Sequence, residues 1–368
     1  MLTADEQHRY RRHVQLPEIG EAGQLRLRDA RVLVVGAGGL GCPVLQYLAA
    51  AGVGTLGIVD SDKVELSNLQ RQILYGPDDL GQRKAEVAAR ALHRLNPLVV
   101  TEIHAYRVTL GNVRELVSRY DVVVDGSDNF PTRYLLNDAC VSLGKPLVSG
   151  AIYKFEGQVS VFNYQGGPTY RCLFPQPPSA QEAPNCEATG VLGVLPGLVG
   201  TAQATEALKV VLGLGEVLSG RLWLLDALTF ETRTLRFKRR PEQAAITLDT
   251  ANHDDYADLC GVGVSSVSVP ELLRQLHSGN PPFLLDVREP EEYAAGHLPG
   301  ATLLPLSALD RGAAAVPRHH PVVVYCRSGA RSARAVERLQ REYGLANLLN
   351  LEGGILAWSD VVNKESVE

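Results

Sequence analysis

The sequence predicts an α/β protein of two domains, the first built on a Rossmann-like parallel sheet. Its 368 residues exceed the size at which a single hydrophobic core usually stops growing. A glycine-rich turn joins a strand pattern to a helix pattern within residues 31–60, and an α/β pattern starts again at Val267. We therefore expect a first domain at 1–243, a linker at 244–266 and a second domain at 267–368.

Composition and charge exclude several classes of protein. The net charge of −5 offers no concentrated basic face, so we expect no nucleic-acid partner. The charged N-terminal stretch MLTADEQHRYRRH lacks the apolar core of a signal peptide. The six cysteines occur singly, without the spacing of a disulfide framework or a metal site. These features predict a cytoplasmic protein with reduced thiols.

The segment from Val32 to Val59 needs separate interpretation, because it carries no charge and is long enough to span a bilayer. Seven glycines and a proline interrupt it, however, and its pattern divides into strand, turn, helix and strand. We interpret it as a buried βαβ unit and expect no membrane association.

The remaining elements follow in order. A helix is expected at Gln82–Leu95, then a second βαβ-like unit through YDVVVDGSDNF and KPLVSGA. The runs GQVSVFNY and GRLWLLDALTFETRTLRFKR alternate as antiparallel strands do. The proline-rich segment from Pro175 to Cys186 indicates a crossing loop. From Val267 the pattern predicts helix VPELLRQLHSG, strand FLLDVRE, helix PEEYAAG, strand VVVYC and a final helix.

The glycine-rich turn is typical of a nucleotide-binding loop. Gly36, Gly38 and Gly41 form a G-x-G-x-x-G motif after a strand and before a helix. Glycines allow the backbone to turn sharply and approach a phosphate, which the helix N-terminus attracts. Asp60 ends the next strand 24 residues after Gly36, where a carboxylate can bond ribose hydroxyls. Alone, these features would suggest an NAD-dependent dehydrogenase.

The polar residues that follow favour chemistry on the phosphates of ATP. Asn68, Arg71 and Lys84 come after the second strand, and Asp128 and Asn129 come just past another strand end. Such residues converge at the carboxyl edge of a parallel sheet. Cations there can stabilise phosphates and an acid can hold Mg²⁺, whereas a dehydrogenase would leave Arg71, Lys84 and Asp128 without a role.

A family resemblance extends this interpretation over about residues 5–240. It is carried by the stretches RYRRHVQLPEIG, GAGGLGCP, VDSDKVELSNLQRQ, GQRKAE, DGSDNFPTRYLLND and PNCEATGVLGVLPG. They resemble the adenylating enzymes that activate ubiquitin-like sulfur carriers in molybdopterin and thiamin biosynthesis. The resemblance implies that ATP and its metal are bound by Gly39, Asp60, Asn68, Arg71, Lys84 and Asp128.

The same resemblance implies a partner and a reaction. Arg12 would reach into the site of a neighbouring subunit, which implies a homodimer. The carrier would end in Gly-Gly. Its terminal carboxylate would attack the α-phosphate of ATP and release pyrophosphate, leaving an acyl-adenylate.

Two cysteine features depend on this resemblance. Cys186 stands where the family can link covalently to the carrier, and the open alternative is a loop residue without chemistry. The family usually holds a structural zinc with two Cys-x-x-Cys pairs. Here Thr169 replaces one cysteine of the first pair and leaves only Cys172, and EQAAITLD stands in place of the second. We therefore expect no zinc site.

Cys326 lies between a predicted strand and a predicted helix in VVVYCRSGARSARAVERL. The loop that follows it consists of Arg327, Ser328, Gly329, Ala330 and Arg331. Its backbone N–H groups, its two arginines and the helix dipole should favour a thiolate. A phosphatase loop has the form Cys-x5-Arg, whereas this loop is Cys-x4-Arg, a tighter cradle better suited to one sulfur. A buried inert cysteine is the structural alternative.

The C-terminal segment also resembles a known family. LLDVREPEEYAAGHLPGA and YCRSGARSA, within about residues 267–360, are similar to rhodanese-type sulfurtransferases, which implies a persulfide on Cys326. We predict an enzyme that adenylates a sulfur carrier and then converts it to a thiocarboxylate. The sulfur would come from thiosulfate or a cysteine desulfurase. The alternatives are an activating enzyme for protein conjugation, with a Cys186 thioester and a docking rhodanese domain, and a redox sensor that uses Cys326.

Overall fold

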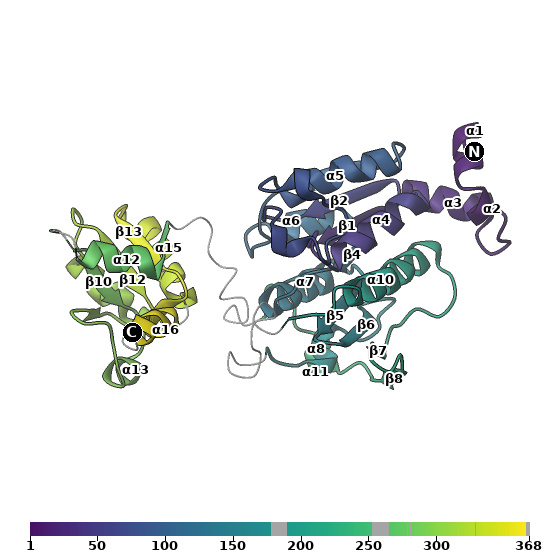
Figure 1. Cartoon of the computed structure of the whole chain (residues 1–368). Coiled ribbons are helices and arrows are strands. Elements are labelled where there is room, and N and C mark those ends of the chain that lie inside the picture. The colour runs from purple at the N-terminus through teal and green to yellow at the C-terminus, as the bar shows by residue number, and fades with distance from the viewer. Residues whose placement is uncertain (178–189, 252–264, 278, 280, 328, 366–368) are drawn as a thin grey trace. The chain divides into compact units, whose positions relative to one another are not determined.

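The chain divides into two compact units, Met1–Asp255 and Tyr256–Glu368 (Figure 1). The structure, a computed structural model, describes residues 1–177, 190–251, 265–277, 279, 281–327 and 329–365. Residues 244–251, which the sequence pattern assigned to the linker, contact the first unit. Leu248 is buried, and its N–H donates to Ser142 Oγ at 3.0 Å.

An eight-stranded sheet of order β3-β2-β1-β4-β5-β6-β7-β8 forms the centre of the first unit. Five strands run parallel: β1 (Arg31–Val35), β2 (Thr55–Val59), β3 (Val100–His104), β4 (Val122–Asp125) and β5 (Leu147–Tyr153). Three continue antiparallel: β6 (Glu156–Phe162), β7 (Arg221–Asp226) and β8 (Thr232–Arg236). The predicted mixture of a parallel sheet and antiparallel strands is confirmed.

Helices cover this sheet and build its core. The longer ones are α3 (Gly20–Asp29), α4 (Gly41–Ala51), α5 (Lys84–Leu95), α7 (Phe130–Leu143) and α10 (Leu195–Leu212). The shorter ones are α1 (Ala4–Arg9), α2 (Arg11–Val14), α6 (Val113–Ser118), α8 (Tyr170–Leu173) and α11 (Pro241–Ala244). Apolar residues of α4, α5 and α10 join Val34 and Val124 in one core. Leu33 and Val123 alternate with them toward the other face and are equally buried. Both faces of the parallel strands are therefore covered, which explains their uninterrupted apolar sequences.

The uncharged segment Val32–Val59 is the predicted βαβ unit, formed by β1, α4 and β2. Gly52 ends α4 with φ of +82°, a conformation that glycine adopts without steric cost. In the described part of the chain, no helix has the length and apolar character that crossing a membrane requires.

The second unit is a five-stranded parallel sheet of order β11-β10-β12-β13-β9. Its strands are β9 (Ser266–Val267), β10 (Phe283–Asp286), β11 (Thr302–Leu303), β12 (Val322–Tyr325) and β13 (Leu348–Leu351). Its helices are α12 (Val269–Leu276), α13 (Pro290–Ala294), α14 (Leu309–Gly312), α15 (Ala330–Tyr343) and α16 (Gly354–Glu365). Each helix and strand predicted after Val267 is present, and apolar residues pack on both faces of β12.

The corner where the resembled family holds zinc joins α8 to α11. Cys172 Sγ lies 3.4 Å from Thr169 Oγ1 and 3.4 Å from the backbone nitrogen of Arg240. Thr169, which stands at the place of a cysteine, thus contacts the sulfur directly. Among the described residues, no three His, Cys, Asp or Glu side chains are grouped to hold a metal ion.

We expect the purified protein to contain no stoichiometric zinc. A structural zinc site needs four ligands, and the sequence supplies only Cys172 where two cysteine pairs would stand. Elemental analysis of the purified chain measures this directly, and a chelator should leave its melting temperature unchanged. About one zinc ion per chain would contradict the prediction.

A buried ion pair stabilises this corner. The Arg171 guanidinium binds the Asp138 carboxylate, with Nη2 at 2.7 Å and Nε at 2.9 Å from its oxygens. Both side chains are almost fully buried, and Arg171 also stacks over the Tyr134 ring with its Cζ 4.8 Å from the ring centroid. The ion pair therefore links helix α8, which carries Arg171, to helix α7, which carries Asp138.

Replacing Asp138 with alanine should destabilise the first unit by about 3–5 kcal/mol, because it removes the carboxylate that balances the buried charge of Arg171. Urea unfolding of the Trp358→Phe background, followed by Trp223 fluorescence, reports the first unit alone. Asp249→Ala is the matched control, since its partner Arg114 is half exposed and the pair should contribute less than about 1 kcal/mol. Equal losses in the two variants would show that the buried pair is not a major stabilising contact.

Candidate functional site

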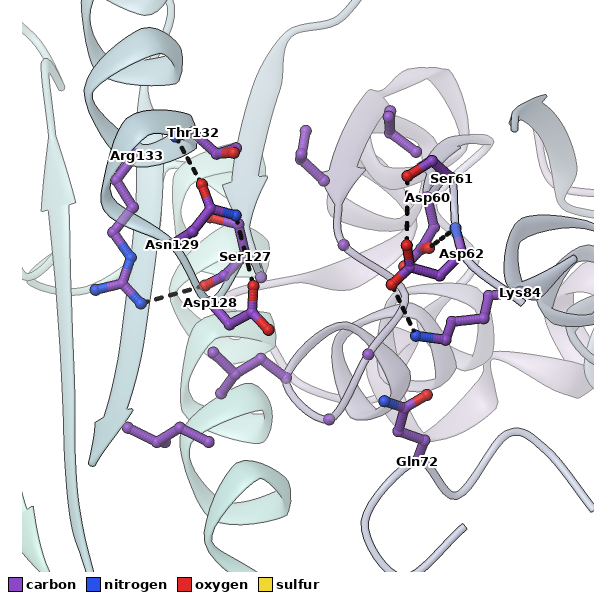
Figure 2. Close-up of a pocket in the computed structure, with 18 of the residues that line it drawn as sticks. Asp60, Ser61, Asp62, Gln72, Lys84, Ser127, Asp128, Asn129, Thr132 and Arg133 are labelled. Carbon is purple, nitrogen blue, oxygen red and sulfur yellow. Dashed lines mark hydrogen bonds and ion pairs between the residues drawn. The ribbon is translucent and has the colours of Figure 1, made fainter. Parts of the chain in front are cut away.

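A cavity of about 240 Å³ opens at the carboxyl ends of the parallel strands in the first unit. Figure 2 shows residues of its lining, with Asp60 and Asp62, which follow β2, on one side and Asp128, which follows β4, on the other. Of the predicted site residues, the lining includes Gly36, Gly38, Gly39, Asp60, Arg71, Lys84, Asp128 and Asn129. The carboxyl edge of a parallel sheet is the place where such folds bind ligands.

The glycines of the turn are required by close backbone contacts. Gly36 has φ of +93°, and a Cβ atom there would lie 2.7 Å from the carbonyl oxygen of Gly126. A Cβ on Gly41 would lie 1.8 Å from the Gly36 oxygen. Two chain segments therefore meet at this turn, which brings the start of α4 and the loop after β4 to the same cavity.

Asp60 is held rigidly beside this turn. Its Oδ2 accepts the N–H of Ala37 at 2.8 Å, and its Oδ1 accepts the N–H of Asp62 at 2.8 Å. Burial raises the pKa of Asp60, while these backbone donors act in the opposite direction. The carboxylate therefore has a fixed orientation at the edge of the cavity, as recognition of a ribose requires.

Two cations, Lys84 and Arg71, line the cavity. Lys84, at the start of α5, is buried and its Nζ lies 3.1 Å from Asp62 Oδ2. Arg71 is partly buried and donates from Nη1 to the carbonyl of Ser67 at 3.0 Å. Asn68 is different, because it is not among the lining residues and its Oδ1 accepts the N–H of Glu65 at 3.3 Å. In this structure Asn68 stabilises the turn that carries Arg71.

Asp128 and Asn129 follow β4 on the opposite side. Asn129 is the N-cap of α7, where its Oδ1 accepts the N–H of Thr132 at 3.0 Å. Asp128 is exposed, and its Oδ1 makes only a long contact to Asn129 Nδ2, at 3.5 Å, among the described residues. The carboxylate oxygens of Asp128 are thus available to a ligand in the cavity.

Sequence reasoning missed several lining residues. Gln72 is 4% exposed, and its Oε1 has no hydrogen-bond partner among the described residues. Arg133 lies one helical turn after Asn129 and donates from Nη2 to the Ser127 carbonyl at 3.2 Å. Gln72 directly follows Arg71, and Arg133 lies four residues after Asn129 on the same face of α7, so closeness in sequence to predicted site residues was the available signal.

Tyr106 was also missed, although it follows the end of β3 as Asp60 follows β2. Its hydroxyl lies 3.1 Å from Nδ1 of His104, whose Nε2 lies 2.8 Å from the Tyr120 hydroxyl. Burial lowers the pKa of His104, which favours the neutral ring. This chain of contacts holds Tyr106 at the cavity wall.

Two predicted residues are not among the described lining residues of the cavity. Arg12 is exposed on α2 and is not part of the cavity lining of its own chain. Cys186 lies outside the described residues, so its role stays a prediction.

Cys326 occupies the predicted position in the second unit, between β12 and α15. It is 1% exposed, and its sulfur accepts the N–H of Gly329 at 3.2 Å. The hydroxyl of Ser332, which is fully buried, lies 3.4 Å from the same sulfur. The same hydroxyl lies 3.0 Å from the Gly329 carbonyl oxygen, so its one proton is shared between that oxygen and Sγ. The sulfur thus meets one backbone N–H and one hydroxyl, polar groups that suit an anionic sulfur. Ser328 lies outside the described residues.

The arginines of this loop differ from expectation. Arg327 is exposed. Arg331 donates from Nη1 and Nη2 to the two carboxylate oxygens of Glu292, each at 2.6 Å. Because Glu292 balances its charge, Arg331 does not add the positive charge near the sulfur that the sequence suggested.

Comparisons with known proteins agree with both units. The ThiF family model matches residues 10–245, and the Rhodanese-like domain model matches residues 268–361. The adenylyltransferase and sulfurtransferase MOCS3 of Sus scrofa is 44% identical, covering 98% of this chain and 87% of the relative. The sulfur carrier protein adenylyltransferase of Thermus thermophilus is 52% identical, covering 71% of this chain and 98% of the relative.

A relative of similar length and a solved structure complete the comparison. MoeZ of Mycobacterium tuberculosis, named a probable adenylyltransferase/sulfurtransferase, is 43% identical and covers 100% of this chain and 96% of the relative. The crystal structure of E. coli MccB with ATP has a TM-score of 0.53 at 21% identity, covers 59% of this chain and 66% of that one, and supports the fold of the first unit. The chain belongs to the ThiF family and carries a rhodanese-like domain at residues 268–361.

Proposed function

We propose that this enzyme adenylates the C-terminal carboxylate of a small ubiquitin-like sulfur carrier and then transfers sulfur to it. One observation carries the proposal. The same chain holds a cavity lined by a glycine turn, cations and carboxylates, and a cysteine whose sulfur accepts hydrogen bonds at a strand end. The full-length relatives are named for both activities, adenylyltransferase and sulfurtransferase.

Different residues of the cavity have different roles in the adenylation step. Asp60, fixed by two backbone donors, orients the nucleotide through its ribose. Arg71 and Lys84 stabilise charge on the phosphates as the carrier carboxylate attacks the α-phosphate and pyrophosphate leaves. The glycine turn allows the phosphates to approach the backbone at the start of α4.

Asp128 fits the requirements of a Mg²⁺ ligand. Its carboxylate is exposed and lies on the cavity lining, and hard oxygen ligands are those that Mg²⁺ prefers. Mg²⁺ commonly binds through one or two carboxylates together with substrate phosphates, which agrees with a single acid here. When bound, the ion would neutralise phosphate charge. Asn129 would keep Asp128 in place through the cap of α7.

Sulfur transfer is assigned to Cys326. Its thiolate takes the outer sulfur of thiosulfate and releases sulfite, which leaves a persulfide. The terminal sulfur of that persulfide attacks the carbonyl of the acyl-adenylate, and AMP leaves. A thiol then attacks the Cys326 sulfur of the acyl disulfide, which releases the carrier thiocarboxylate and leaves a disulfide on Cys326. Two external thiols reduce that disulfide by successive exchange and leave as a disulfide of their own. Cys186 is our candidate for the attacking thiol.

The proposed partners follow from these steps. The carrier ends in Gly-Gly, so that its unbranched terminus can enter the cavity. The sulfur donor is thiosulfate or the persulfide of a cysteine desulfurase. We also propose a homodimer in which Arg12, exposed on α2, completes the site of the partner subunit.

Mass spectrometry of candidate carriers tests the function. Each carrier is incubated with the enzyme, ATP and thiosulfate, and a mass gain of one sulfur-for-oxygen exchange is expected. A carrier recovered as a protein conjugate would favour an activating enzyme that uses Cys186. No ATP-dependent change in any carrier, together with reversible oxidation of Cys326, would favour a redox sensor.

A further inference from the structure

The arginine of the Cys326 loop is engaged by an acid from another segment of the second unit. Glu292 lies on α13, 39 residues before Arg331, and accepts two parallel hydrogen bonds from its guanidinium, each of 2.6 Å. Both side chains are about one-third exposed. This paired geometry uses the same two donors with which an arginine binds a tetrahedral anion.

The ion pair persists over the whole physiological pH range. Hydrogen bonds from Arg331 lower the pKa of Glu292 to about 2, so the carboxylate is charged at any pH above that value. The hydrogen bonds to Glu292 also raise the pKa of Arg331. Arg331 ends the five-residue loop that follows Cys326, and Glu292 balances its charge.

Among the described residues, the groups that contact the sulfur are uncharged. The described groups that contact Sγ are the N–H of Gly329 at 3.2 Å and the hydroxyl of Ser332 at 3.4 Å. A persulfide carries one negative charge, which two neutral donors can stabilise. A phosphate dianion carries two charges, and its binding depends on charged, paired donors.

We propose that Glu292 is a specificity-determining residue of this site: by occupying Arg331, it weakens the binding of all tetrahedral dianions to the Cys326 loop, thiosulfate as well as phosphate, and leaves neutral donors for a singly charged sulfur. The inference rests on the proposed sulfur-transfer role of Cys326. It assigns Glu292 a positioning role, because Glu292 acts through Arg331 and does not contact the sulfur.

The full-length enzyme carrying Glu292→Gln tests this in a thiosulfate-to-cyanide sulfurtransferase assay. The freed guanidinium should lower KM for the thiosulfate dianion by roughly three- to tenfold. Inorganic phosphate should then inhibit competitively at concentrations that leave wild type unaffected. The rate of iodoacetamide alkylation of Cys326 should rise at lower pH than in wild type. Glu291→Gln is the matched control, because it removes the same charge from an exposed neighbour.

Further variants separate the outcomes. Glu292→Gln/Arg331→Gln should lose the new phosphate inhibition, since the proposal assigns that inhibition to the freed arginine. Glu292→Asp has a side chain that is one methylene shorter and should be inhibited by phosphate more weakly than Glu292→Gln. It replaces Glu292→Gln as the test variant if the glutamine variant does not fold. If Glu292→Gln lowers kcat but shows neither phosphate inhibition nor a changed alkylation profile, the Glu292–Arg331 pair only supports the loop. That result would overturn the proposed specificity role of Glu292. Wild type without Cys326-dependent activity would instead overturn the proposed function.

Discussion

Asp128→Ala should abolish ATP–pyrophosphate exchange in the presence of a carrier that ends in Gly-Gly. The exposed carboxylate of Asp128 lies on the cavity lining opposite Lys84 and is our candidate Mg²⁺ ligand (Figure 2). Without it, the charge on the leaving pyrophosphate is not compensated, at a cost of about 3 kcal/mol or more. That cost corresponds to a loss of at least about a hundredfold in rate. Exchange of labelled pyrophosphate into ATP measures the effect.

The control for this variant is Asp78→Ala, which removes an exposed aspartate that does not line the cavity. It should exchange at the wild-type rate. Both variants should show the same thermal unfolding, because Asp128 is exposed and makes only a long contact to Asn129. Exchange by Asp128→Ala at nearly the wild-type rate would place the metal ligand elsewhere.

Cys326→Ala should abolish thiocarboxylate formation from thiosulfate and leave ATP–pyrophosphate exchange intact. The reason is a division of labour between two compact units. The proposed ATP contacts all lie before residue 130, in Met1–Asp255, while Cys326 lies in Tyr256–Glu368. Both activities are measured on the same preparation, by exchange and by carrier mass.

Cys140→Ala is the matched control for the thiol, since it removes a buried cysteine from α7 and touches neither site. It should retain both activities, with a lower melting temperature from the small cavity that it creates. If Cys326→Ala still produced full thiocarboxylate with thiosulfate as the only sulfur source, the rhodanese-like unit would be a docking module.

The cavity of the first unit could be predicted because several of its lining residues lie at strand ends. In a parallel sheet all strands end at the same edge, so the residues that directly follow the strands lie there together. The glycine turn after β1, Asp60 after β2 and Asp128 after β4 therefore had to converge once the strands were recognised. Cys326 follows the same rule at the end of β12.

Contacts between distant segments could not be predicted in this way. Nothing in the local pattern showed that Asn68 would support its own turn, or that Gln72 would be buried at the cavity with an unpaired oxygen. Both outcomes depend on how a short irregular segment folds back on the sheet. No hydrophobic periodicity constrains such a segment.

By itself, the sequence determined the α/β class, the two-unit organisation and the strand-end placement of Asp128 and Cys326, because periodicity and glycine spacing act over a few residues. Only the tertiary structure decided which charges remain available. Arg331 is paired with Glu292, and Arg171 is buried against Asp138, in each case across more than thirty residues of chain. Such pairs form where packing brings two segments together, and their energy depends on distance and burial rather than on position in the sequence.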